Sequence, residues 1–200
     1  MTTTIDYYFA PQSPWTYLGH QRLVDIARAA DAQIRVRPVD LGRVFPVFGG
    51  VQLKDRHPQR QAYRLVELAR FRDYLKVPLN LEPKYFPVVA TLASKLIIAV
   101  QLAHGEPAAL KIAGALMTAV WVQERDIADP DTLSRILSEC GLPPECLLSA
   151  ESAESQTFYD DYTQQAIELG VFGAPTYVLN GELYWGQDRL MFLENALHGH

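Results

Sequence analysis

The order in which strand-like and helix-like segments follow one another is the feature that most constrains the fold of this chain. Short β-branched and aromatic segments occur at residues 5–9 and 33–38 near the start and at residues 175–185 near the end. From residue 57 to about residue 140 the apolar residues recur only at helical spacing. The two ends of the chain must therefore supply the sheet, and the middle must be an insertion made of helices.

The first end of the chain predicts a strand, a helix and a second strand. From Ser13 the pattern becomes helical, with one apolar face made by Leu23, Ile26, Ala27 and Ala30. In the segment QIRVRPV apolar residues then alternate with arginines, and Pro38 marks the end of a strand or an edge position. Such β-α-β units are almost always right-handed, so the two strands are expected to be parallel neighbours.

The other end predicts a helix, a hairpin and a final helix. The first helix ends at Gly170 and carries the apolar residues Phe158, Tyr162, Ala166 and Leu169. Asn180-Gly181 then joins two apolar runs, and this dipeptide supplies the positive φ angles of a type I′ turn. The chain closes with a helix that bears Leu190, Leu193 and Leu197.

Helix boundaries can also be read in the middle of the chain. Gly105 is expected to end one helix, Asp129-Pro130 to begin another, and Gly141 to end it. The order β-α-β, helices, α-β-β-α is the thioredoxin arrangement. We therefore predict an α/β protein in which residues 1–45 and 151–200 form a thioredoxin-like domain and residues 46–150 form an inserted all-helical domain.

Charge and hydropathy exclude several classes of partner. The formal net charge of -5 comes from mixed signs along the chain, so no basic face is predicted for nucleic acid. The N-terminal residues lack the basic and apolar regions of a secretion signal, and no apolar run reaches about 18 residues. We expect a soluble cytoplasmic protein that binds neither nucleic acid nor a membrane.

The cysteines and histidines give no sign of a metal site. Cys140 and Cys146 form no C-x-x-C pair, and neither stands at ligand spacing from a histidine. In a reducing cytosol, two such thiols are expected to be reduced and structural. The five histidines also lack metal-ligand spacing.

The start of the first helix is where a thioredoxin arrangement places its chemistry. That helix end offers unpaired N–H groups and a partial positive charge, which favour an anion. Thiol-disulfide enzymes place a thiolate of a C-x-x-C motif there, but this chain has Ser-Pro-Trp-Thr at residues 13–16, which excludes a disulfide oxidoreductase. A serine at this point can donate a hydrogen bond to a thiolate that a ligand brings.

Ser13 also has simpler interpretations. Serine followed by proline is a common N-cap and N1 pair, so Ser13 could be no more than a helix cap. A serine nucleophile is disfavoured, because no G-x-S-x-G elbow surrounds Ser13 and Pro14 removes an N–H that an oxyanion hole would need. Capping and thiolate binding both remain open from the residues alone.

Three segments together resemble the 2-hydroxychromene-2-carboxylate isomerase family. They are YYFAPQSPWTYLG at residues 7–19, EPKYFPV at residues 82–88 and VFGAPTYVLNGELYWGQDRL at residues 171–190. The likeness extends over nearly the whole chain, and this family is related to the kappa-class glutathione transferases and the DsbA-type oxidoreductases. The resemblance implies the same fold and identifies the external thiol as glutathione.

Site residues follow from the resemblance position by position. Ser13 matches the serine that faces the glutathione sulfur. Ala174-Pro175 matches a cis dipeptide whose backbone pairs with the tripeptide like an added strand. Sequence alone favours a trans bond there, since only about 5–6% of X-Pro bonds in folded proteins are cis. Gln187 and Asp188 match a polar pair that holds the γ-glutamyl end, although both also suit a helix cap.

The activity that the resemblance implies is a glutathione-dependent cis-trans isomerisation. It interconverts 2-hydroxychromene-2-carboxylate and trans-o-hydroxybenzylidenepyruvate in aromatic hydrocarbon catabolism, and glutathione acts as a cofactor that is not consumed. Two alternatives remain, a kappa-class-like transferase that conjugates electrophiles and a non-catalytic thioredoxin-like module that binds peptides. Relatives are often dimers, so a homodimer is possible. Ala10 stands where the family commonly has an acidic residue, which leaves open how the serine loop is braced.

The implied substrate is an aromatic 2-oxo acid, so a basic group should meet its carboxylate. Residues 54–72 contain six basic side chains and two acidic ones, a local excess in an acidic protein. Lys54 and Arg60 are the candidates, with Lys84 as a further option, although any one of these residues could belong to a solvated helix face. The aromatic ring could be walled by Trp15, Tyr85, Phe86 and Trp185.

Overall fold

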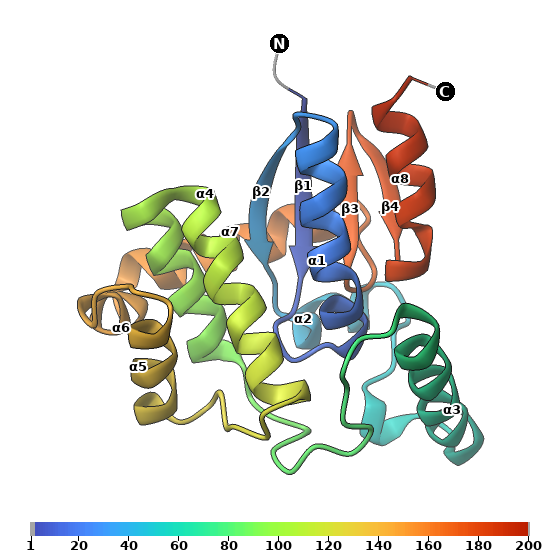
Figure 1. Cartoon of the computed structure of the whole chain (residues 1–200), viewed down its shortest axis with the longest axis horizontal. Helices are drawn as coiled ribbons and strands as arrows, with labels where there is room; N and C mark the ends of the chain where they lie inside the picture. The colour runs from blue at the N-terminus through green and yellow to red at the C-terminus, as the bar shows by residue number, and fades with distance from the viewer. Residues whose placement is uncertain (1–2, 200) are drawn as a thin grey trace.

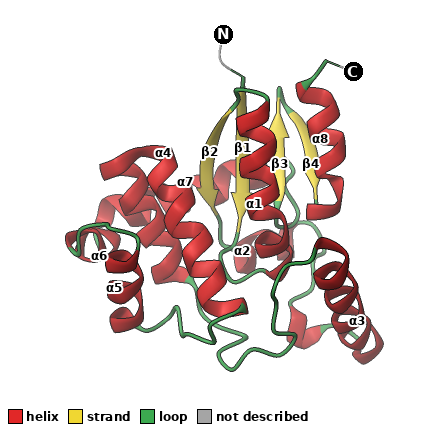
Figure 2. Cartoon of the chain, viewed as in Figure 1, coloured by secondary structure: helices red, strands yellow, loops and turns green. Residues whose placement is uncertain are grey.

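The computed structural model describes residues 3–199. Its strands lie in one sheet with the order β2-β1-β3-β4, and helices make up most of the rest of the chain (Figure 2). The two ends of the sequence lie side by side in this sheet, while the middle extends away from it (Figure 1). The predicted thioredoxin-like arrangement with helices between its two parts is confirmed.

The strands pair as the sequence order predicts. β1 (Thr4–Phe9) and β2 (Gln33–Pro38) are parallel and are joined by α1 (Pro14–Ala29). β3 (Thr176–Leu179) pairs antiparallel with β1 on one side and with β4 (Glu182–Trp185) on the other. β2 is therefore an edge strand, which accounts for the proline that ends it.

Both faces of the sheet are covered by helices. Tyr7 and Phe9 of β1 are buried in the cluster that includes the apolar side of α1. Tyr8 points to the other face and is buried with residues of α7 (Ala153–Glu168), which lies behind the sheet in Figure 1. Because β1 is covered on both faces at its carboxyl end, its last three residues, 7–9, are all aromatic and buried. α8 (Leu190–Leu197) completes the face that α1 covers.

The longest helix of the described residues folds back on itself. α4 (Thr91–Trp121) is interrupted at Gly105, where φ is 80° and ψ is 177°. The Phe86 ring, which precedes the helix, lies 4.8 Å from the ring of Trp121 at its far end. A straight helix of 31 residues would be about 46 Å long. The chain therefore reverses direction at Gly105, and the helix end predicted there is confirmed.

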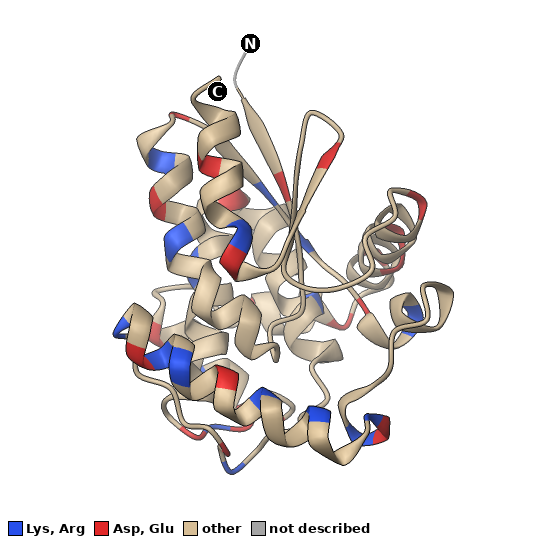
Figure 3. Cartoon of the chain, turned by 90° about the vertical axis from the view of Figure 1, so that its right-hand side faces the viewer, with Lys and Arg blue, Asp and Glu red and all other residues tan. Residues whose placement is uncertain are grey.

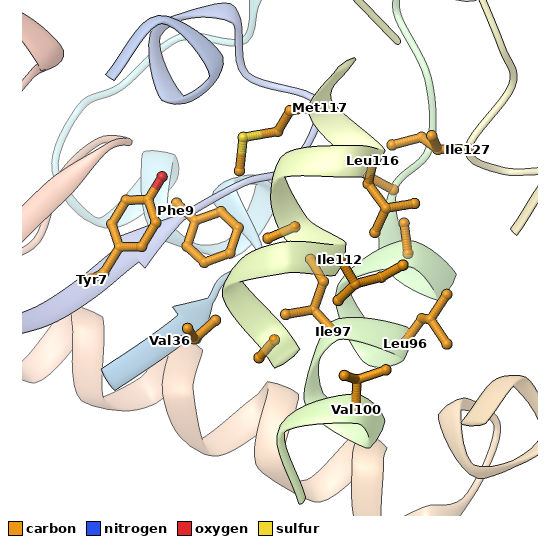
Figure 4. Close-up of a cluster of buried hydrophobic side chains, with 14 of the residues drawn as sticks. Tyr7, Phe9, Val36, Leu96, Ile97, Val100, Ile112, Leu116, Met117 and Ile127 are labelled. Carbon is orange, nitrogen blue, oxygen red and sulfur yellow. The ribbon is translucent and has the colours of Figure 1, made fainter. Parts of the chain in front are cut away.

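The apolar composition of α4 is explained by burial in the core. Taken as one helix, α4 is long and apolar enough to cross a membrane. From the sequence we expected no apolar run of that length. Side chains from both of its halves, such as Ile97 and Ile112, are fully buried (Figure 4). They belong to the same cluster as Phe9 and Val36 of the sheet. The division of the chain into two domains stays a prediction. The apolar core is continuous across the predicted boundary between them.

Local signals set the ends of several elements. Asp129 caps α5 (Pro130–Glu139), and its carboxylate accepts hydrogen bonds from two N–H groups of the first turn. Gly141, with a φ of 68°, follows the end of that helix. Asn180 and Gly181 have φ values of 53° and 84°, as a type I′ turn requires. All three boundaries agree with the sequence predictions.

The sequence did not predict the short helices. α2 (Leu41–Val47) begins after Asp40, whose carboxylate accepts a hydrogen bond from the N–H of Gly42, and α6 (Glu145–Ala150) follows a pair of prolines. Each is too short to show a helical period in its apolar residues. By contrast, α3 (Pro58–Leu75) is long enough to be recognised from its apolar stripe.

A buried histidine joins α1 to α4. The Nε2 atom of His20 lies 3.1 Å from the carbonyl oxygen of Leu110, and its Nδ1 lies 3.3 Å from the hydroxyl oxygen of Tyr7. The carbonyl can only accept, so Nε2 carries the proton and Nδ1 accepts from Tyr7. Gly114 lets the helices approach, because a Cβ there would lie 3.1 Å from the imidazole ring. Burial lowers the pKa of His20 to about 4.

We expect His20 to make the protein less stable as the pH falls. The unfolded chain binds a proton at His20 below about pH 6.5, whereas the folded chain excludes it until about pH 4. The unfolded state therefore gains protons first, and the free energy of unfolding falls by about 3 kcal/mol across that range. His20→Gln should flatten this part of the pH dependence of the urea midpoint, while His57→Gln, at an exposed position, should not. An unchanged slope in the His20 variant would contradict the assignment.

Candidate active site

Ser13 occupies the N-cap position of α1, directly after the turn that follows β1. Its Oγ lies 3.3 Å from the N–H of Thr16 and accepts a hydrogen bond from it. Accepting this bond leaves the hydroxyl proton of Ser13 free to donate. The capping interpretation is confirmed, and it is compatible with a second role in binding a ligand.

The loop before Ser13 is held by its own backbone. The N–H of Ser13 donates to the carbonyl oxygen of Ala10 at 3.0 Å, and the carbonyl oxygen of Ser13 accepts from Tyr17 at 3.0 Å. Ala10 is fully buried, so this position has no room for a solvated carboxylate. The main chain thus braces the serine loop without the acidic residue that the family pattern commonly has there.

Two peptide bonds that precede prolines are cis. The Ala174–Pro175 bond is cis, as the resemblance implies, and the trans form that sequence alone favours is wrong. The Phe86–Pro87 bond is also cis and was not predicted. Among the described residues, none forms a hydrogen bond with the N–H or the carbonyl of Ala174. The N–H and the carbonyl of Ala174 are therefore both available to pair with an extended ligand.

Ser13 and Ala174 line a cleft with two adjoining arms. The serine arm, of about 690 Å³, is lined by Ser13 and by a group of apolar residues that includes Phe45, Phe48, Phe86 and Val88. The hairpin arm, of about 570 Å³, lies between α3 and the residues that follow β4. The arms share six lining residues, which are Trp15, Arg56, Arg60, Arg64, Ala174 and Trp185.

The predicted polar pair after β4 lies in the hairpin arm, at the start of the 3₁₀ helix η2 (Gln187–Arg189) that leads into α8. The side chain of Gln187 is buried, and Arg22 donates to its Oε1 at 2.9 Å and to its carbonyl oxygen at 3.0 Å. Asp188 is partly exposed and forms an ion pair with Arg189. Asp188 is the charged member of the pair, and its carboxylate remains partly exposed to the cleft.

The structure brings only part of the predicted substrate set to the cleft. Arg60 and Phe86 line it, together with the two tryptophans that were expected to wall a ring site. Lys54 is exposed and lines neither arm. The ammonium group of Lys84 lies 4.9 Å from the ring of Tyr85, and Tyr85 lines a different hollow on the surface, beside Arg125.

Sequence reasoning counted Arg56 and Arg64 among the basic residues but did not select them. Both line the two arms of the cleft. The Nε of Arg56 donates to the carbonyl oxygen of Val51 at 2.9 Å, and burial together with the charge of Arg60 lowers the pKa of Arg56. Arg64 and Leu68 are the two buried residues of α3. Their spacing of four residues was the available signal that Arg64 faces inward.

The two cysteines are remote from this chemistry. Cys140 and Cys146 are free and buried, as expected, and neither lines the cleft. Burial raises the pKa of each thiol, so both stay protonated near neutral pH. Within residues 3–199 no group of three or more histidine, cysteine or acidic side chains is arranged to hold a metal ion.

The sheet order, the cis-proline and the capped helix at the cleft define a protein of the DsbA-like thioredoxin class. The family model of the DsbA-like thioredoxin domain matches residues 4–198. The cytosolic disulfide reductase DsbM from Pseudomonas aeruginosa shares this fold, with a TM-score of 0.69, 18% identity and coverage of 98% of each chain.

Comparison with full-length relatives gives the particular family. A 2-hydroxychromene-2-carboxylate isomerase from Pseudomonas putida is 32% identical over 96% of this chain and 93% of its own length. The enzyme of that name from Sphingobium xenophagum is 31% identical, over 98% of this chain and 99% of its own. A solved structure of such an isomerase has a TM-score of 0.81 and 28% identity, and covers 98% of this chain and 94% of its own. The chain belongs to the 2-hydroxychromene-2-carboxylate isomerase family and is an enzyme of the isomerase class.

Proposed function

We propose that this enzyme uses glutathione to catalyse the cis-trans isomerisation of 2-hydroxychromene-2-carboxylate and trans-o-hydroxybenzylidenepyruvate, or of close analogues, in aromatic hydrocarbon catabolism. The observation that carries the proposal is Ser13, which caps α1 at the wall of a cleft and keeps a free hydroxyl proton. No cysteine stands at this helix end to serve as the nucleophile, so a thiol has to come from a ligand.

The residues around Ser13 fit an extended thiol tripeptide. The unpaired N–H and carbonyl of Ala174 can exchange backbone hydrogen bonds with it, as a strand does with a sheet edge. The carboxylate of Asp188, farther along the hairpin arm, can meet an ammonium group at one end of the tripeptide. In this orientation the hydroxyl of Ser13 and the positive end of α1 would hold the thiol, in the serine arm.

When bound, glutathione would supply a nucleophilic thiolate for reversible addition to a conjugated carbon of the substrate, and Ser13 at the start of α1 would hold that thiolate. The role of the protein in this chemistry is to keep the thiol ionised. Lowering a thiol pKa by about two units requires roughly 2.7 kcal/mol of preferential thiolate stabilisation. A charge-assisted hydrogen bond from Ser13 contributes about 1.5–3 kcal/mol, and the helix end contributes up to about 2 kcal/mol.

The rest of the serine arm suits an aromatic ring. Its apolar side chains come from the start of α1, from α2, from the loop before α4 and from further segments that contribute Leu53 and Phe172, so separate parts of the chain close around one space. Trp15 and Trp185 stand where the two arms meet. Trp15 is fixed by an edge-on contact with Phe71 of α3, at 5.9 Å between ring centroids.

The test is the stoichiometry of glutathione during turnover. Purified enzyme is supplied with 2-hydroxychromene-2-carboxylate, the two isomers are followed by absorbance, and free thiol is counted at the end. We expect isomerisation that requires catalytic amounts of glutathione and leaves all of it free. Loss of one thiol per product would show conjugation, as in a transferase, and an unchanged substrate with no glutathione binding would favour a non-catalytic module.

A further inference from the structure

Arg64 is a buried cation without a counter-charge. Only 9% of the residue is exposed, and its Nη2 has no hydrogen-bond partner among the described residues. No carboxylate within residues 3–199 lies within ion-pair distance of Arg64. Its guanidinium carbon lies 5.1 Å from the ring centroid of Phe86 and 5.9 Å from that of Trp121.

The charges around Arg64 add to the imbalance. Arg56 and Arg60 line the same two arms, and neither forms an ion pair with an acidic residue of the described chain. Glu67, which lines the hairpin arm, is the one acidic side chain on the cleft-lining part of α3. Burial, with a smaller effect from Arg56, lowers the pKa of Arg64 to about 10, so it remains a cation at neutral pH. Figure 3 shows basic positions recurring along this helix.

An arrangement of this kind is unfavourable for the protein alone. An unpaired charge that is taken out of water destabilises the folded state, and two more like charges nearby add repulsion. Ring faces at 5–6 Å recover only part of that cost. A carboxylate that enters the cleft offsets this cost, because the guanidinium can then form two parallel hydrogen bonds to it.

We propose that Arg64 is the receptor for the carboxylate of the planar aromatic 2-oxo acid, with Arg56 and Arg60 reinforcing the positive field at the same point. The identity of the substrate in this inference rests on the proposed function. The binding of an organic carboxylate at Arg64 rests on the geometry alone. Arg64 takes the place of Lys54 and Lys84, which the sequence had offered for this role.

The position of Arg64 favours the substrate over the carboxylate of glutathione. Its guanidinium lies over Phe86, which lines the serine arm and not the hairpin arm. A flat ring bound among the apolar side chains of the serine arm would therefore have its carboxylate within reach of Arg64. The tripeptide is expected along Ala174 and the hairpin arm. Because Arg64 borders both arms, the two sources of carboxylate have to be separated by experiment.

The test compares an acid with its neutral ester. The probes are trans-benzylidenepyruvate and its methyl ester, and their binding is measured by quenching of tryptophan fluorescence without glutathione. In Arg64→Met the Kd of the acid should rise about 10- to 150-fold, while that of the ester stays within about twofold of the parent. The matched control is Arg70→Met, which removes an exposed arginine of α3 that lines neither arm and should change neither Kd.

Two further readouts make the outcome decisive. The melting temperature of Arg64→Met should not fall, because replacing an unpaired buried charge by an apolar side chain is neutral or stabilising. The Kd of glutathione should stay within about twofold of the parent value.

Equal weakening of the acid and the ester would overturn the proposal and make Arg64 a support for the apolar wall. Weaker glutathione binding with unchanged acid binding would overturn it in favour of the tripeptide carboxylate. A cofactor other than glutathione would leave the acid and ester result intact.

Discussion

Replacing Ser13 with alanine is expected to lower kcat/KM for the isomerisation by about 10- to 150-fold. The physical reason is the loss of one hydrogen bond to a charged sulfur, which is worth about 1.5–3 kcal/mol. The helix end and the cleft remain in the variant, so some activity should persist. The measurement is the initial rate at subsaturating substrate, with glutathione held well above its Kd.

Loss of the helix cap has to be separated from loss of the thiolate contact. Ser152 provides a matched control, because its Oγ caps α7 by accepting from the N–H of Ser155 at 3.2 Å and it lines neither arm of the cleft. Both Ser13→Ala and Ser152→Ala should lower the free energy of unfolding by about 1 kcal/mol. Only the Ser13 variant should lose activity. Full activity in that variant, or equal losses in both, would contradict the role given to Ser13.

Replacing Trp121 with alanine is expected to lower the free energy of unfolding by about 3–5 kcal/mol. Trp121 is fully buried at the end of α4, and its indole packs 4.8 Å from the ring of Phe86. Removing a large buried side chain loses its transfer free energy and leaves a cavity that the surroundings fill only in part. The change should appear as a lower urea midpoint in a single cooperative transition, since α4 and the sheet share one apolar core.

Trp185 serves as the comparison for that substitution. It is 46% exposed and contacts Phe172 edge-on at 4.8 Å, so Trp185→Ala removes the same side chain from a site that solvent already reaches. Its effect on the free energy of unfolding should be well below that of Trp121→Ala. Similar losses for the two variants would show that the indole of Trp121 is not the packing centre that its burial indicates.

The elements that the sequence predicted well are those fixed by neighbouring residues. Asn180-Gly181 determines its turn through two positive φ angles, and Asp129 determines a helix start through its own carboxylate. The break in α4 at Gly105 is likewise local. α2 and α6 were missed because six or seven residues cannot display a helical period. They pack against distant parts of the chain, α2 against α7 and α6 against α4.

The site was predictable only where its chemistry lies in one segment. Ser13, with the proline that follows it, could be recognised as the start of a helix without a redox cysteine. For Arg64, the four-residue spacing from Leu68 indicated only that the side chain faces inward. Its packing against Phe86 and Trp121 could not be predicted, because these residues lie far away in the sequence. The same limit applies to Gln187, whose side chain is held by Arg22, 165 positions earlier.

The most direct measurement of the central claim is the pKa of the glutathione thiol when the tripeptide is bound to the enzyme. The thiolate is followed by its ultraviolet absorbance as the pH is raised, with the parent enzyme and with Ser13→Ala at saturating protein. We expect the bound thiol to ionise about two units below the value of about 8.5 for a free thiol, and much of this shift to disappear in the variant. A bound thiol that titrates like the free one would contradict the role of Ser13 and the helix end.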